Sequence, residues 1–180
     1  MGLDMYAYRM PLTVLEKWQE EYGDPVGSET WYSFNPRKAA RQVHGFKHLT
    51  DEELSKKSQL ERDWYWDTIR VADAQVDKQN LLEVNYHYWR KFNALHGWME
   101  ELWRQRSGAG AAENFNCTTV RLGKGDLERL YDERNNLTPV GGFFFGAAEV
   151  YPEDVKSLET FLEKARKDVD TNAIFYDSWW

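Results

Sequence analysis

Apolar and polar side chains alternate from Leu3 to Met10, with the period of two that is typical of a β-strand. Pro11 ends this alternation. Apolar residues then recur at helical spacing from Leu12 to Tyr22, and the turn-forming residues at 23–25 follow as a stop signal. The pattern therefore predicts an N-terminal strand followed directly by a helix.

The next segment, up to about Leu49, is rich in loop-forming residues. Thr50 then stands three residues before Glu53, which is the spacing of a capping box, so we expect a helix to begin at Thr50.

Between Leu60 and Gln105 the sequence contains no proline, and Gly97 is its only glycine. This composition favours long helices, with a break near residues 77–80. Apolar residues spaced by three and four predict that the second of these helices is a long central one, about six turns in length. Its apolar stripe consists of Leu81, Val84, Tyr88, Phe92, Leu95, Met99 and Leu102.

The remaining residues alternate between strand and helix patterns. Strands are predicted over residues 117–122, 141–147 and 173–180, and helices follow Asp126 and Pro152. These elements predict one α+β domain over residues 1–180, in which a small sheet of about four strands packs against the long central helix and further helices. The first strand must join this sheet from far away in sequence.

Composition and charge narrow the classes of function. The chain has nine Trp, ten Tyr and nine Phe residues, more than a core of this size normally uses, and Trp and Tyr are enriched at binding surfaces. A formal net charge of −7 disfavours binding to nucleic acid. The single cysteine, Cys117, excludes an internal disulfide framework and is expected to be a small buried residue. Without an apolar run of membrane-spanning length or a signal peptide, we expect a soluble, cytoplasmic protein with no membrane contact.

One segment departs from the acidic balance, because residues 30–50 contain four cations and no acid. These cations, Arg37, Lys38, Arg41 and Lys47, form either a solvated basic face or a candidate anion-binding patch. His44 and His48 lie four residues apart in the same segment but lack a third ligand, so no metal site is predicted. The common phosphate-binding and nucleophile motifs are also absent, and we predict no cofactor.

Candidate binding residues are concentrated on the predicted long helix. Four of them are spaced so that they share one face of a helix: Trp89, Asn93, His96 and Glu100. Glu100 could orient the His96 imidazole as an acid–base pair, line a ligand pocket with it, or form an ordinary ion pair on the helix surface.

Aromatic residues near the C-terminus are candidates for an interface. Phe143, Phe144 and Phe145 are consecutive in a predicted strand, so they must point to both of its faces. Trp179 and Trp180 end the sequence, where side chains fray unless they dock. An exposed patch of these residues would mark a binding surface.

Several blocks together resemble a family of small uncharacterised proteins encoded by phages and prophages. The blocks are MGLDMYAYR at the start, YWRKFNALHGWM from Tyr88 to Met99, GGFFFG, and FYDSWW at the end. The resemblance covers about residues 1–10 and 84–180, and it implies that residues 23–76 are a subfamily-specific insertion. The family has no assigned activity. The resemblance also implies a shared core or site made of Asp4, Tyr6, Trp89, Arg90, Asn93, His96, Trp98, Gly142, Phe143 and Gly146.

The leading hypothesis is a non-enzymatic phage accessory protein that acts in the host cytoplasm, in host takeover or against host defence. It would bind a protein of the host or the phage through an aromatic, partly acidic surface. The alternative is a small-ligand or nucleotide pocket, with or without catalysis, in which Arg90, His96 and their helix neighbours face Asp4 and Tyr6. The sequence does not predict the oligomeric state.

Overall fold

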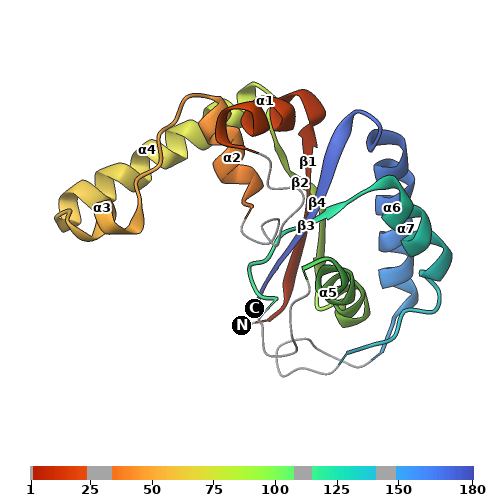
Figure 1. Ribbon diagram of the computed structural model, residues 1–180. Coiled ribbons are helices and arrows are strands. Elements are labelled where there is room, and N and C mark those ends of the chain that lie inside the picture. Colours follow the sequence, from red (N-terminus) through yellow and green to blue (C-terminus); the bar gives the residue numbers. More distant parts are fainter. Residues whose placement is uncertain (1, 24–33, 108–114, 141–148) are drawn as a thin grey trace.

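A computed structural model describes residues 2–23, 34–107, 115–140 and 149–180. Within these residues the chain forms helices on both sides of one small sheet (Figure 1). In chain order the elements are β1 (Asp4–Pro11), α1 (Leu12–Tyr22), α2 (Pro36–Val43), α3 (Asp51–Ser55), α4 (Gln59–Lys78), β2 (Glu83–Arg90), α5 (Asn93–Ser107), β3 (Val120–Leu122), α6 (Lys124–Glu133), α7 (Pro152–Asp168) and β4 (Asn172–Trp179).

The four-stranded sheet has the order β2-β1-β4-β3, and each neighbouring pair is antiparallel. β1 pairs with β4 along its whole length, from Asp4 opposite Trp179 to Pro11 opposite Asn172. The predicted joining of the first strand to a distant part of the chain is thus confirmed, as is the α+β class.

The two faces of the sheet are covered differently. On one face, which we call the covered face, apolar side chains such as Met5, Trp89 and Tyr176 pack against α5, α6 and α7. On the other face, Tyr8, Met10, Ala173 and Phe175 pack under α1 and α2, and we call this part the closed end. α1 and α2 thus cover only one end of this face. The face itself continues along β1, β2 and β4.

The predicted long central helix is wrong, because its first half is the strand β2. Leu81, Val84 and Tyr88 are spaced like a helix stripe, but residues 83–90 are rich in Val, Tyr and Trp, which favour strands. Left-handed backbone at Asn80 (φ 52°) and Lys91 (φ 58°) separates β2 from the helices on either side. Sheet pairing with β1 therefore overrides a helical spacing that arose by coincidence.

α3 and α4 form an arm that projects away from the body (Figure 1). The predicted capping box at Thr50 is confirmed by reciprocal bonds between Thr50 and Glu53, but the helix it starts ends at Ser55. A second box between Ser58 and Glu61 then begins α4. The expected loop before residue 49 contains α2, because Asn35 caps a helix there by accepting from the Lys38 amide at 2.9 Å.

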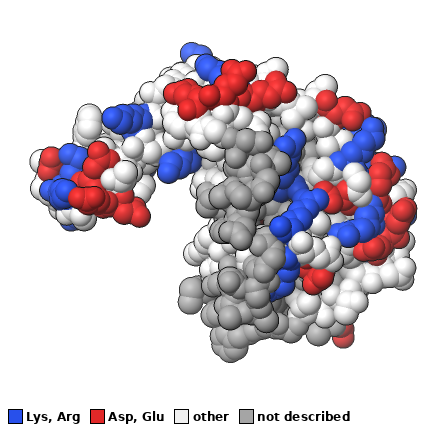
Figure 2. All heavy atoms as spheres, in the orientation of Figure 1, with Lys and Arg blue, Asp and Glu red and all other residues white. Residues whose placement is uncertain are grey.

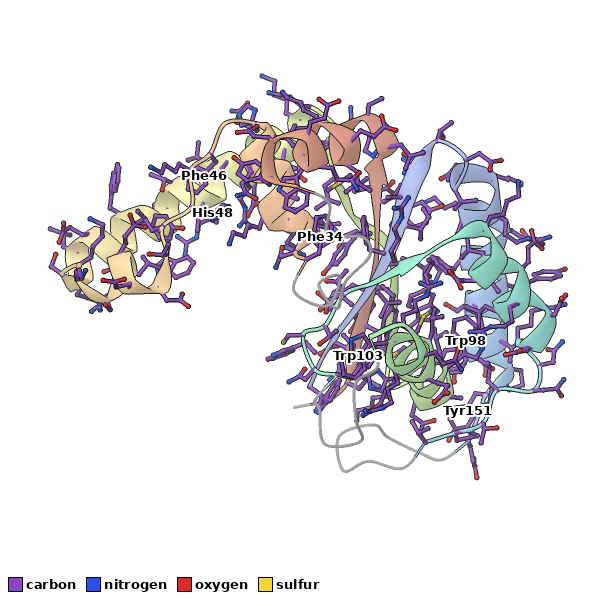
Figure 3. All side chains as sticks on the ribbon, viewed as in Figure 1. Phe34, Phe46, His48, Trp98, Trp103 and Tyr151 are labelled. Carbon is purple, nitrogen blue, oxygen red and sulfur yellow. The ribbon has the colours of Figure 1, made fainter. Side chains whose placement is uncertain are left out.

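Contacts along α4 hold the arm in place. Phe46 and His48 lie beside α4, as Figure 3 shows, and their rings pack together at 4.9 Å. The amide of Leu49 donates to the Tyr65 hydroxyl at 3.2 Å, and Arg41 of α2 forms a bidentate ion pair with Asp73 at 2.6 and 3.1 Å. These contacts fix the direction in which the arm leaves the body.

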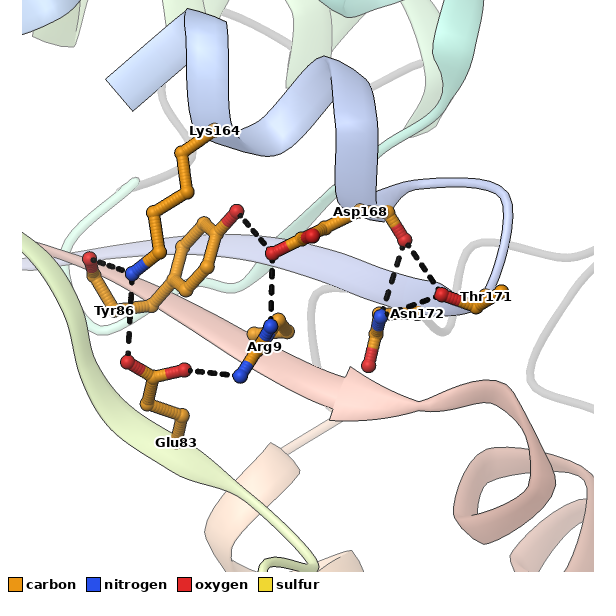
Figure 4. Close-up of polar contacts among 7 residues, drawn as sticks. All are labelled: Arg9, Glu83, Tyr86, Lys164, Asp168, Thr171 and Asn172. Atoms are coloured by element: carbon orange, nitrogen blue, oxygen red, sulfur yellow. Dashed lines mark hydrogen bonds and ion pairs between the residues drawn. The ribbon is translucent and has the colours of Figure 1, made fainter. Parts of the chain in front are cut away.

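A polar network ties α7 to β1 and β2 (Figure 4). Arg9 donates to Asp168 at 2.8 Å and pairs with Glu83 at 2.8 Å. The Tyr86 hydroxyl donates to the same Asp168 carboxylate at 2.9 Å, and Lys164 lies 3.9 Å from the centre of the Tyr86 ring. Because both carboxylates in this network are paired, it fastens the edge of the sheet to α7 without leaving an unpaired charge.

Asn116 holds the end of β4. Its side-chain amide donates to the Trp180 carbonyl at 3.1 Å, and its side-chain oxygen accepts from the Trp180 amide at 3.0 Å. The neighbouring amide of Cys117 donates to the carbonyl of Ser178 at 2.8 Å. These bonds dock the final residues instead of leaving them to fray.

Candidate functional site

Six side chains from three strands lie together on the sheet, on the same face as the closed end but at its other end. Across the strands, Asp4 is opposite both Arg90 and Trp179, and Tyr6 is opposite both Tyr88 and Asp177. Directly opposite residues and residues two apart point to the same face of a sheet. We call this group of Asp4, Tyr6, Tyr88, Arg90, Asp177 and Trp179 the open face.

Asp4 is the polar centre of the row that Arg90, Asp4 and Trp179 form across the three strands. The Tyr88 hydroxyl donates a hydrogen bond to its Oδ1, and the Arg90 Nε lies 3.8 Å from the same oxygen. This hydrogen bond to Asp4, together with burial, raises the pKa of Tyr88 to about 12. The phenol therefore stays protonated and keeps the Asp4 carboxylate in place at neutral pH.

Asp177 carries a carboxylate that is poorly satisfied. Among the described residues its Oδ1 is buried and accepts no hydrogen bond. Burial raises the pKa of Asp177 to about 6, although the Ser178 amide and the charge of Arg37 act in the opposite direction. A buried acceptor without a donor costs free energy, so this oxygen is suited to a donor brought by a binding partner.

Aromatic rings surround these carboxylates. The Tyr6 and Tyr88 rings lie 5.3 Å apart, and Tyr6 stacks on Tyr8 at 6.4 Å. Tyr88 and Trp179 are the exposed members, with 48% and 53% of their surface accessible to solvent. Arg37 of α2 lies 5.7 Å from the Tyr8 ring and marks the boundary with the closed end.

The sheet divides the pocket that the sequence suggested. Asp4, Tyr6 and Arg90 are on the open face, whereas Trp89 points to the covered face and packs against Phe161 at 4.9 Å. The predicted shared helix face is wrong, because Trp89 belongs to β2 while Asn93 and Glu100 belong to α5. Asn93 is buried at the start of α5.

His96 is fully buried, with 0% of its surface exposed. Its Nδ1 lies 3.0 Å from the Tyr176 hydroxyl, and the rings of Phe115 and Trp180 pack against it at 5.2 and 4.8 Å. Burial lowers the pKa of His96 to about 4, so the imidazole is neutral at physiological pH. Glu100 pairs with Arg104 at 2.6 Å instead of with His96. His96 and Glu100 therefore contact other residues of the fold and do not form a pair with each other.

The four cations of the predicted anion patch have separate surroundings. Arg37 faces the Tyr8 ring, and Arg41 is paired with Asp73. Lys38 and Lys47 are exposed. An anion would therefore meet two solvated lysines, while both arginines already have partners, and the binding of an anion here stays a prediction.

The candidate interface aromatics fall into three groups. Trp179 is exposed on the open face, and Trp180 packs against the covered-face core. Phe143, Phe144 and Phe145 lie outside the described residues, and so does the strand predicted for 141–147. The expectation of a buried Cys117 is wrong, because Cys117 is exposed in a left-handed turn with φ 57°.

Over 2–23, 34–107, 115–140 and 149–180, no three His, Cys, Asp or Glu side chains gather as they would around a metal ion. In the same ranges, no helix has the length and apolar character needed to cross a bilayer.

Sequence reasoning missed Tyr88 and Asp177 as members of the open face. The spacing of Tyr88 fits an apolar helix stripe, although the residue belongs to β2. Asp177 lies in a terminal strand whose neighbours in the sheet do not follow from its own sequence. The alternation of Phe175, Asp177 and Trp179 was a signal, because these residues share one face of any strand.

Comparison with known proteins adds no relative to this description. No protein-family model matches the chain, and neither does any curated protein or solved structure. The kinship with phage-encoded proteins is therefore a prediction from the sequence blocks.

Proposed function

We propose that this protein is a non-enzymatic binding protein that recognises a protein partner through the open face. The observation that carries the proposal is the placement of two half-exposed aromatic residues, Tyr88 and Trp179, on either side of Asp4. Aromatic side chains in this setting are the residues that most often dominate the energy of protein interfaces.

The chemistry of the open face favours a partner segment with a basic or hydrogen-bond-donating side chain. Asp177 offers a buried oxygen with no donor among the described residues, and Tyr6 lies directly opposite it on β1. A cation is stabilised by a carboxylate and by aromatic ring faces at once. The resemblance to phage proteins suggests a host or phage protein as the partner, with host takeover or anti-defence as the setting.

The test is affinity capture from host lysate on immobilised protein, with the captured proteins identified by mass spectrometry. The wild type is compared with Trp179→Ala and with a control, Trp66→Ala. Trp66 lies on α4 and is 49% exposed, against 53% for Trp179, so the two substitutions remove similar surface. We expect a stoichiometric partner that is retained by the control and lost by Trp179→Ala.

The affinity of the purified partner is then measured by calorimetry. An interface hot spot implies that Trp179→Ala weakens binding by roughly 30-fold or more. Equal binding by Trp179→Ala and Trp66→Ala would contradict the proposal. Release of a stoichiometric nucleotide or other small molecule on denaturation, with no protein captured, would favour a ligand pocket instead.

A further inference from the structure

The arm carries an apolar surface that the fold does not use. Leu60, Trp64 and Val71 of α4 are 80%, 69% and 63% exposed. At 3.6 residues per turn they lie within about 40° of one another around the helix axis. We call these three residues the arm stripe.

A different face of α4 already supplies the contact with the rest of the chain. Tyr65, Ile69, Ala72 and Val76 are its buried residues, and they are directed away from the arm stripe. α4 is therefore apolar on two separate sides, centred about 130° apart around its axis, and the fold covers one of them. A surface helix of a monomer needs a single apolar stripe, so the arm stripe calls for a partner.

We infer that the arm stripe is the contact surface of a homodimer in which α4 of a second copy packs antiparallel against it. The charges beside the stripe favour this occupant. Asp63 and Arg70 are exposed, lie seven residues apart, and flank the stripe on the same side. In an antiparallel pair related by a two-fold axis, Asp63 of each copy lies opposite Arg70 of the other.

The same register brings the apolar residues together. Trp64 then lies beside Val71 of the second copy, and Leu60 lies between Val71 and Ala74 of the second copy. Sliding the pair by one heptad would instead place Arg70 opposite Arg70, which repels. The surface is therefore self-complementary in one register, as an isologous contact requires.

The ion pair that Arg70 already forms is weak enough for Arg70 to contact the second copy as well. Arg70 pairs with Asp67 at 2.6 Å, with side chains 80% and 67% exposed, and such surface pairs contribute little stability. Asp67 lies within the stripe, near the two-fold axis, so the Asp67 carboxylates of the two copies face each other and each is neutralised by the Arg70 of its own helix. A polar residue at the centre of a helix pair lowers its affinity and fixes its register.

A membrane fits the arm less well than a second copy. Residues 51–78 contain eight acidic and five basic residues, and Figure 2 shows both signs mixed at the tip of the arm. An amphipathic helix that lies on an anionic bilayer has a basic polar face. The projection of the arm from the body also leaves room for a second helix alongside it (Figure 1).

The size of the contact sets the expected affinity. α4 has 20 residues and is therefore about 30 Å long, so a contact along one of its faces falls among small interfaces, below roughly 1,200 Å² in total. Contacts of that size are reversible, and we expect a dissociation constant on the order of 10 μM.

Sedimentation equilibrium of the whole protein from roughly 1 to 300 μM tests this, because the range brackets that dissociation constant. We expect a monomer at the low end and a dimer at the high end. Trp64→Ala should weaken the dimer by roughly 30-fold, whereas Trp66→Ala, about 200° further round the same helix, should leave it unchanged.

Charge exchange tests the antiparallel register. Asp63→Arg or Arg70→Asp alone places like charges opposite each other at two symmetric positions, and each should weaken the dimer by about tenfold. The double variant, Asp63→Arg with Arg70→Asp, restores opposite charges and should return the dissociation constant to within about threefold of the wild type.

Three results would overturn the inference. One is a wild type that stays monomeric over the whole concentration range, which would leave the stripe to another partner. The second is a dimer that Trp66→Ala weakens as much as Trp64→Ala does. The third is a double charge variant that is no stronger than the single ones.

Discussion

Phe175 and Trp179 lie on the same strand and point to the same face of the sheet, yet their surroundings differ completely. Phe175 is fully buried in the closed end, where α1 and α2 supply Leu15 and Ala40 as neighbours. Trp179 is 53% exposed beside Asp4. Four residues of strand thus separate a position that holds the fold together from one that is available for binding.

The comparison shows that one face of a sheet can be buried at one end and exposed at the other. Helices that end part of the way along a sheet bury its apolar rows and leave the remaining rows to water or to a partner. In this protein the remaining rows contain carboxylates and aromatic rings, which keep the face compatible with water while retaining residues that bind well.

The largest effect on stability is expected from the removal of an aromatic side chain, and it should differ between the closed end and the open face. Phe175→Ala should lower the free energy of unfolding by about 3–5 kcal/mol, because it leaves a cavity in a packed cluster. Trp179→Ala should lower it by at most about 1 kcal/mol, because half of its surface is already in water. Urea titration followed by circular dichroism measures both. Equal losses would mean that the open face is part of the core.

A second prediction uses pH to probe the covered face. The pKa of His96 is about 4 in the folded chain and near 6.5 when unfolded, so only the unfolded state takes up its proton between these values. The contribution of His96 to stability is therefore complete above pH 6.5 and declines by about 3 kcal/mol as pH falls to 4.

Urea titrations at several pH values test this, with His96→Gln as the comparison. Burial also lowers the pKa of His48 to about 4, so some acid sensitivity should survive the substitution. The difference in slope between the two chains isolates His96. If the slopes are identical, the imidazole is not held neutral by burial.

A third prediction has the opposite sign and concerns the open face. The pKa of Asp177 is raised to about 6, above its unfolded value, so its contribution to stability is present at low pH and is lost as pH rises through 6. Asp177→Asn should therefore raise the free energy of unfolding at pH 7.5 by about 1–2 kcal/mol and leave it unchanged near pH 3.

Asp132→Asn is the matched control for this substitution, because Asp132 is an exposed carboxylate on α6. The control should change stability little at either pH. The more stable Asp177→Asn variant should bind the proposed protein partner less well, because residues that lower stability at a binding site are often kept for their function. A variant that is more stable and binds equally well would separate Asp177 from recognition.

The smallest effect is expected from two tyrosine hydroxyls on β2. Tyr86→Phe removes a buried donor to Asp168 and should cost about 1–2 kcal/mol. Tyr88→Phe removes the donor to Asp4 and should cost less than about 1 kcal/mol, because water reaches the half-exposed site. Thermal unfolding of the two variants ranks them, and the reverse order would contradict the assignment of the open face.

Local signals in the sequence predicted the parts of the fold that depend on neighbouring residues. The alternation after Leu3, the capping box at Thr50 and the proline at the start of α7 gave elements close to those observed. β2 was missed because the spacing of Leu81, Val84 and Tyr88 satisfies a helix, while its pairing with β1 depends on residues about 80 positions away.

The candidate site was predicted in part for the same reason. Asp4, Tyr6 and Arg90 lie side by side on the open face, but His96 is on the far side of the sheet. Which residues share a site depends on strand order and register, and neither follows from the pattern of a single segment. Tyr88 and Asp177 could join the site only after β2, β1 and β4 were known to be neighbours.

The bonds between Asn116 and Trp180 have a consequence for how the chain can vary. Strand side chains alternate between faces, so sliding β4 by a single position would turn Trp180 outward and Trp179 inward and would invert every other residue of the strand. Asn116 grips the backbone of Trp180 at both its amide and its carbonyl and so acts as an end stop for this sliding. An insertion or deletion of one residue within β4 would exchange its open-face residues with core residues, whereas substitutions at Trp179 alter the open face and leave the register of the strand unchanged.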